Sequence, residues 1–159
     1  MARTLIAGFG NVLRGDDGFG IAVLDRLEAR GGLPAEVVLL EVGTGGLQLA
    51  QALLDPYDRV IVVDAMSGGR APGHLYVHRV ESVAAAREVD LHLAVPSQAL
   101  AVAQALNPLP AEVYLVGCEP VETEELHMGL SAAVEATIDR AVRAIDALLA
   151  PAEPVPVSP

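Results

Sequence analysis

The chain has 159 residues, of which 52% are hydrophobic and 3% aromatic, and its net charge at pH 7 is −11. That length and apolar share fit one domain with an aliphatic core. The acidic charge argues against nucleic-acid partners and against adsorption to anionic membranes, because both need a basic surface. No apolar run reaches the roughly 18 residues of a membrane-spanning helix, and the N-terminus lacks a secretory pattern. We therefore expect a cytoplasmic protein with no membrane insertion.

Residues 3–8 form an apolar run that predicts a buried strand. A glycine-rich turn follows, and the amphipathic run behind it predicts a helix over residues 17–30. Asp16 and Asp17 lie where the turn meets the helix. Carboxylates at this position complement the helix dipole, which is one interpretation of the pair. The other interpretation is an acid–base or metal site.

Strands and helices alternate along the rest of the chain. Apolar runs predict strands over residues 36–41, 59–63 and 112–117, and helical patterns cover residues 47–54, 95–106 and 131–149. Ser131 is the expected N-cap of the final helix. Residues 74–80 alternate between apolar and polar side chains after a loop too short for a helical crossover. We therefore expect that strand to run antiparallel to its neighbour.

This order of elements predicts an α/β fold, a three-layer αβα sandwich of the phosphorylase/hydrolase-like kind. Its sheet should be twisted and mostly parallel, with about five strands, one of them antiparallel. Residues 1–150 should form a single domain. Residues 151–159 contain four prolines and no periodic apolar pattern, and we expect them to be a disordered tail.

Carboxylates follow several of the predicted strands. Asp16 and Asp17 come after the first strand, Glu41 ends the second, Asp64 ends the third and Glu119 follows the last. Ligands of such folds gather outside the carboxyl ends of the strands. These side chains therefore predict an acidic rim on one edge of the sheet.

Two histidines are candidates to complete a metal site with the carboxylates. Two carboxylates and one imidazole suit a borderline divalent metal with open coordination positions. His92 is the first candidate for the imidazole, and His127 is the second. For both histidines the alternative is a solvated surface side chain.

Two further kinds of site have weaker signals. Gly8-Phe9-Gly10 resembles the start of a dinucleotide-binding fingerprint, but Leu13 stands where the third glycine belongs. Cys118 follows a strand and is a candidate nucleophile, although we favour a buried structural thiol.

Six motifs in order resemble those of the nickel–iron hydrogenase maturation endopeptidases, over about residues 3–149. They are Gly8-x-Gly10-Asn11-x-Leu13-x-x-Asp16-Asp17-Gly18-x-Gly20, Gly43-Thr44-x-Gly46, Val62-Val63-Asp64-Ala65, Pro72-Gly73, Val116-Gly117-x-x-Pro120 and Gly129-Leu130-Ser131. One place departs from the family's pattern, because Glu41-Val42 stands where the family usually has Asp-Gly.

The resemblance implies the family's mixed sheet between helix layers and an endopeptidase activity. The expected substrate and partner is the precursor of the hydrogenase large subunit, which loses a C-terminal extension after nickel has been inserted. The resemblance further implies that Asp17, Asp64 and His92 recognise this nickel. The metal is supplied by the substrate and is not held permanently by the enzyme.

Within this interpretation Asp17 and Asp64 are the expected catalytic residues. The candidate accessory residues are Asp16, Glu41, Glu119 and His127. One possible mechanism uses the substrate's nickel as a Lewis acid whose bound water attacks the peptide carbonyl. Another uses Asp17 or Asp64 as general base, with nickel serving only for recognition. A monomer could act on the large partner in either case.

Two other functions stay open at this point. The first is a non-cleaving, nickel-sensing or chaperone-like partner of the large subunit, which would form the complex without removing the peptide. The second is a nucleotide-binding α/β protein that uses the Gly8–Gly10 turn. Thermal stabilisation by nucleotides would favour the second.

Overall fold

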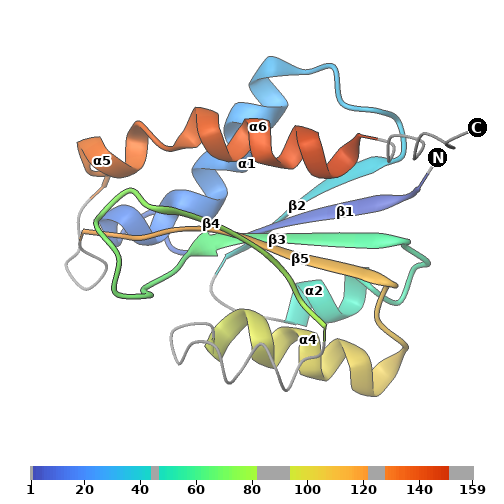
Figure 1. The fold of residues 1–159 in the computed structure, drawn as a ribbon. Helices are drawn as coiled ribbons and strands as arrows, with labels where there is room; N and C mark the ends of the chain where they lie inside the picture. Colours follow the sequence, from blue (N-terminus) through green and yellow to red (C-terminus); the bar gives the residue numbers. More distant parts are fainter. Residues whose placement is uncertain (1, 44–46, 82–93, 122–127, 151–159) are drawn as a thin grey trace, which may run out of the picture.

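A sheet of five strands lies between two layers of helices (Figure 1). The computed structural model describes residues 2–43, 47–81, 94–121 and 128–150. The elements in chain order are β1 (Thr4–Phe9), a short 3-10 helix (Gly15–Gly18), α1 (Phe19–Arg30), β2 (Val37–Gly43), α2 (Leu47–Ala52), β3 (Arg59–Ala65), β4 (Leu75–Arg79), α4 (Ala94–Leu106), β5 (Glu112–Cys118), α5 (Ala132–Glu135) and α6 (Ile138–Leu149).

The sheet has the spatial order β2-β1-β3-β5-β4. Strand β1 pairs in parallel with β2 and β3, and β3 pairs in parallel with β5. Strand β4 lies at the edge and runs antiparallel to β5. The predicted three-layer, mostly parallel sheet with one antiparallel strand is thus confirmed. The short segment between β3 and β4 cannot hold a crossover helix, so β4 returns along the sheet in the opposite direction.

The two faces of the sheet build two separate cores. Because side chains alternate along a strand, Leu5, Ala7 and Phe9 of β1 face one core, while Ile6 faces the other. Helices α2 and α4 cover the first face, and α1 and α6 cover the second (Figure 1). Burial on both faces explains why the central strands read as nearly continuous aliphatic runs.

Helix α1 begins in close contact with the ends of the two central strands. A Cβ placed on Gly20 would lie 2.3 Å from the carbonyl oxygen of Val63 and 2.4 Å from that of Phe9. Only a residue without a side chain lets the helix approach β1 and β3 this closely. The contact fixes the 3-10 helix, one turn earlier, at the carboxyl edge of the sheet.

The structure corrects two details of the sequence prediction. Residues 15–18 form a 3-10 helix, so α1 begins at Phe19 and not at residue 17. The single helix expected over residues 131–149 is wrong, because α5 ends at Glu135 and α6 begins at Ile138. Between them the hydroxyl of Thr137 lies 2.7 Å from the carbonyl oxygen of Gly73, and this contact holds the junction against the loop before β4.

Ser131 occupies the backbone position of an N-cap, as predicted, but it does not cap. Its φ and ψ are −63° and 159°, and its side chain makes no hydrogen bond to the helix. The hydroxyl donates instead to Asp16, at 2.8 Å. The tertiary contact has replaced the local one that the sequence suggested.

None of the helices in the described segments has the length and apolar character needed to cross a membrane. The predicted tail, residues 151–159, lies outside the described residues.

The contact at Gly20 generates a stability prediction. Gly20→Ala should destabilise the fold by about 3 kcal/mol, because the methyl group overlaps two carbonyl oxygens that belong to the rigid sheet. Urea unfolding followed by circular dichroism measures this. The matched exchange Ala29→Gly, at an exposed position of the same helix, should cost only about 1 kcal/mol of helix propensity. Equal losses in the two variants would contradict the packing argument.

Candidate active site

Asp17 is held in the turn between β1 and α1. The turn starts at Gly10, whose φ of +130° is a conformation that glycine adopts readily and other residues rarely do. A Cβ at this position would also lie 1.8 Å from the carbonyl oxygen of Asp17. The backbone N–H of Asn11 donates to the Asp17 carboxylate at 2.9 Å. The side chain of Asn11 accepts from the N–H of Leu13 at 2.9 Å, which stabilises the same turn. The glycine-rich motif therefore positions the carboxylate of Asp17.

Asp64 is the penultimate residue of strand β3, next to the turn that carries Asp17. It stands opposite Gly117 of β5 in the parallel register, and the N–H of Ala65 donates to its carboxyl at 2.8 Å. Burial, reinforced by the negative charge of Asp17, raises the pKa of Asp64 to about 8. The structure thus brings together the two residues that the sequence predicts to be catalytic.

The carboxyl of Asp64 keeps its proton at neutral pH, because its pKa of about 8 lies above that pH. Burial also raises the pKa of Asp17, against the hydrogen bond from Asn11 and the positive charge of Arg14, which both lower it. Asp64 is therefore the member of the pair that is protonated at neutral pH. Because the folded-state pKa of Asp64 exceeds its ordinary value of 3.8, this protonation favours the folded state fully below about pH 4. The contribution is lost as the pH rises through 8.

Asp16 points away from this pair and into the protein. Only 2% of it is exposed. Its carboxylate accepts hydrogen bonds from the N–H of Val121 at 2.8 Å, the N–H of Ser131 at 2.6 Å and the Ser131 hydroxyl. These bonds fasten the segments around β5 and α5 to the turn that carries Asp17. Its contacts are therefore with a distant loop, and not with the first turn of its own helix.

Glu119 is likewise buried and internally bonded. Its carboxylate accepts from the N–H groups of Gly68 and Arg70, at 3.0 and 2.7 Å, and from the hydroxyl of Tyr76 at 3.0 Å. These bonds hold the loop between β3 and β4 onto the sheet edge. The expected acidic rim is therefore divided, because Asp16 and Glu119 have their oxygens turned inward.

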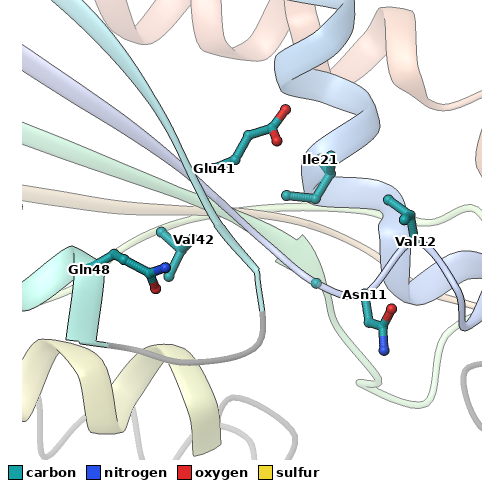
Figure 2. A pocket seen from close by; sticks show the side chains of 7 residues that line it. Asn11, Val12, Ile21, Glu41, Val42 and Gln48 are labelled. Atoms are coloured by element: carbon teal, nitrogen blue, oxygen red, sulfur yellow. The ribbon is translucent and has the colours of Figure 1, made fainter.

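Glu41 lies on the other side of β1, at the wall of a pocket of about 420 Å³. The lining residues are Gly10, Asn11, Val12, Ile21, Glu41, Val42 and Gln48. Figure 2 shows Glu41 directed toward α1 and Val42 toward the opposite layer. A hydrogen bond with Asp25, burial and the charges of Asp25 and Glu28 raise the pKa of Glu41. Sequence reasoning did not find this pocket, because its walls come from four separate elements.

The two candidate histidines, His92 and His127, lie outside the described residues. Within the described part of the chain, no group of three His, Cys, Asp or Glu side chains is placed to hold a metal ion. Cys118 is buried, and this burial raises the pKa of its thiol to about 11. The thiol is protonated at neutral pH, which agrees with the predicted structural role.

Sequence reasoning also missed the part played by Asn11. The residue belongs to the motif that was singled out, but the hydrogen bond to Asp17 comes from its backbone N–H, which every residue except proline carries. Its side chain stabilises the turn by accepting from the N–H of Leu13, but that type of contact does not reveal the bond to Asp17. The spacing of Asn11 and Asp17 within one glycine-rich turn is the signal that was available.

The fold and this site define a class: an α/β protein with an acid–base pair of carboxyl groups at the carboxyl edge of its sheet. Residues 21–147 match the model of the hydrogenase maturation protease family. That range includes Asp64 and begins just after the turn with Asp17.

The chain is also similar to individual hydrogenase expression/formation proteins and maturation proteases. The hydrogenase expression/formation protein HupD of Rhodobacter capsulatus is 38% identical over 143 residues, which are 88% of this chain and 68% of that protein. The hydrogenase 2 maturation protease of Escherichia coli is 33% identical over 150 residues, 92% of this chain and 90% of that protein. The solved structure of the E. coli hydrogenase maturating endopeptidase HybD superimposes with a TM-score of 0.81 at 32% identity, covering 92% and 91% of the two chains. This chain therefore belongs to the hydrogenase maturation protease family, whose members are endopeptidases.

The charge coupling between the two aspartates can be measured directly. Asp17→Asn should lower the titration midpoint of the Asp64 carboxyl from about 8 toward its ordinary value, because the neighbouring negative charge is removed while the burial remains. Carboxyl 13C NMR over a pH series reports this midpoint. Asp55→Asn, at an exposed position before β3 begins, should leave it unchanged. An unchanged midpoint in Asp17→Asn would contradict the pairing.

The inward role of Asp16 predicts a stability loss. Asp16→Asn should destabilise the protein by about 2 kcal/mol, because an amide has one accepting oxygen and would place its N–H₂ group against an N–H donor of Val121 or Ser131. Asp55→Asn should change the free energy of unfolding by less than about 0.5 kcal/mol. Denaturant titration of both variants tests this. An Asp16→Asn protein as stable as the native chain would show that the bonds to Val121 and Ser131 contribute little.

Proposed function

We propose that this protein cleaves the C-terminal extension from the nickel-loaded precursor of a hydrogenase large subunit, in the cytoplasm. The observation that carries the proposal is the pair of Asp17 and Asp64 at the carboxyl edge of the sheet, where burial raises the pKa of both carboxyls and brings that of Asp64 to about 8. Two carboxyl groups that share a proton supply both a base and an acid for peptide hydrolysis. Membership in the hydrogenase maturation protease family supports the choice of substrate.

We assign the acid role to Asp64, because its pKa of about 8 keeps it protonated at neutral pH, and the base role to Asp17. Asp17, as carboxylate, takes a proton from a water molecule while that water attacks the peptide carbonyl carbon. Asp64, as carboxylic acid, gives its proton to the carbonyl oxygen. The resulting tetrahedral intermediate breaks its C–N bond when Asp17 passes the proton to the leaving amine, and Asp64 recovers its own proton from the new carboxyl group. The products are one free carboxyl and one free amine, with one water consumed.

Nickel belongs to the substrate in this proposal. Asp17, Asp64 and His92 recognise the metal of the loaded precursor, so that cleavage follows insertion. Carboxylate and imidazole ligands suit a borderline divalent ion of this kind. The same set is compatible with a Lewis-acid role for the substrate's nickel.

A cleavage assay tests the proposal. The native protein should remove the extension from nickel-loaded precursor, read as a mass loss at the C-terminus. Asp17→Asn and Asp64→Asn should each lower the rate by roughly 100-fold or more, because each loses one partner of the proton transfer. His92→Ala should weaken the response to nickel. The cleavage rates of nickel-loaded and nickel-free precursor should therefore differ less than they do with the native protein.

Asp55→Asn is the control, with the same loss of one carboxylate at a distance from the pair. A native protein that binds the precursor and leaves it uncut would sink the protease proposal and favour the chaperone-like alternative. Full activity in both Asn variants would rule out the acid pair. Unchanged nickel dependence in His92→Ala would remove that histidine from the recognition set.

A further inference from the structure

Three large apolar side chains are exposed around the turn that carries Asp17. Leu13 is 52% exposed in the turn itself, and Val121 and Met128, at 57% and 73%, lie between β5 and α5. We call these three residues the apolar rim. None of them lines the pocket at Glu41. Figure 1 shows the turn after β1 and the segment before α5 at the same end of the sheet.

The backbone of Leu13 is fixed against the 3-10 helix. A Cβ on Gly18 would lie 3.0 Å from the Cα of Val12, so the chain next to Leu13 passes directly over that helix. The N–H of Leu13 donates to the side chain of Asn11 at 2.9 Å. The turn thus presents an apolar side chain to solvent from a backbone that has little freedom of its own.

Asp16 fastens the other two members of the rim to the same 3-10 helix. Its buried carboxylate accepts from the N–H of Val121 at 2.8 Å. It also accepts from the N–H of Ser131, three residues after Met128, at 2.6 Å. Both described ends of the segment between β5 and α5 are therefore held beside the turn. The three side chains belong to one surface at the carboxyl edge of the sheet.

An apolar surface built in this way is suited to binding another protein. Single exposed apolar residues are ordinary, but a group of them held together beside functional side chains marks an interaction site. The bonds of Asn11 and Asp16 already order the backbone of the rim. A partner therefore binds it without the entropic cost of ordering these residues.

The position of the rim identifies its occupant. Leu13 precedes Asp17 by four residues in the same turn. A folded protein that delivers its C-terminal segment to Asp17 must therefore cover this turn. The covering surface has to be apolar, because polar groups placed against Leu13 and Met128 would lose their hydrogen bonds to water without replacement.

We propose that the apolar rim binds the folded body of the hydrogenase large-subunit precursor, through an apolar surface beside the start of its C-terminal extension. The inference rests on the proposed function for the identity of the partner. It gives Asp16 a second task, since the bonds that stabilise the fold also set the shape of the binding surface. The extension itself is left to Asp17 and Asp64.

Affinity for the precursor tests the binding surface. All proteins carry Asp64→Asn, so that a bound precursor stays uncut, and binding to immobilised nickel-loaded precursor is measured by biolayer interferometry. Leu13→Ser and Met128→Ser should each weaken this binding about tenfold, because each removes one apolar side chain from a buried contact.

Leu54→Ser is the matched control. Leu54 is 54% exposed, nearly as much as Leu13, and it lies between α2 and β3 at the opposite end of the sheet. Its replacement should leave the affinity for the precursor unchanged. All three side chains are more than half exposed, so each variant should unfold at the same temperature as the parent protein.

A large subunit produced without its extension separates the folded body from the extension. Leu13→Ser and Met128→Ser should weaken its binding by the same factor, because the rim contacts the body. A loss seen only when the extension is present would assign the rim to the extension and overturn the inference.

Unaltered affinity in both rim variants would also overturn the inference, and so would an equal loss in Leu54→Ser. Sedimentation velocity of the free protein tests a second copy of this chain as the occupant. A native dimer that becomes monomeric in Leu13→Ser, with unaltered affinity for the precursor, would make the rim a contact between two copies.

The two proposals fail separately. With Asp64 in place, the rim variants should raise KM about tenfold and leave kcat nearly unchanged, because the contact forms on binding and persists through the reaction. A native protein that cuts the precursor, with an unchanged KM in both rim variants, retains the protease function and loses the binding surface. A native protein that leaves the precursor intact, but binds it in a rim-dependent manner, loses the protease function and retains the surface.

Discussion

The contact between the first turn of α1 and the ends of β1 and β3 sets the geometry of the site. Gly20 brings the helix backbone against the carbonyl oxygens of Phe9 and Val63, at a separation that any side chain would prevent. Residues 15–18 therefore have little freedom, and their turn must lie over the carboxyl edge of the sheet. Asp17 is fixed beside Asp64 as a result, since Asp64 directly follows Val63. A backbone contact thus positions a pair of side chains.

Adjacent carboxylates have opposite tasks in this protein. Asp16 turns inward and is satisfied by three hydrogen bonds from the segments around β5 and α5. Asp17 acts by its charge on Asp64, and its carboxylate accepts the backbone N–H of Asn11. The first residue stabilises the turn, and the second is left with its charge incompletely compensated. Burial of Asp64, reinforced by the charge of Asp17, is what raises the pKa of Asp64 to about 8, so that it retains a proton at neutral pH.

The distribution of the remaining carboxylates has a similar logic. Glu119 is satisfied by backbone donors and holds a loop, so its charge is not available at the surface. Glu41 is exposed, and its charged neighbours on α1 are negative. The acidic side chains of this protein therefore differ in what they do. Carboxylate oxygens that accept N–H groups stabilise the fold. Carboxylates without such donors contribute a negative potential that attracts cations.

The sequence by itself determined the layers, the mostly parallel sheet, the antiparallel strand β4 and the two aspartates. These follow from local patterns: apolar periodicity, loop length and the position of Asp17 and Asp64 after strands. Tertiary structure decided the break between α5 and α6, the inward turn of Asp16 and Glu119, and the pocket at Glu41. Each depends on a partner far along the chain, such as Gly73 for Thr137 or Ser131 for Asp16. Periodicity records which face a residue occupies, but it does not record which distant group its polar atoms will meet.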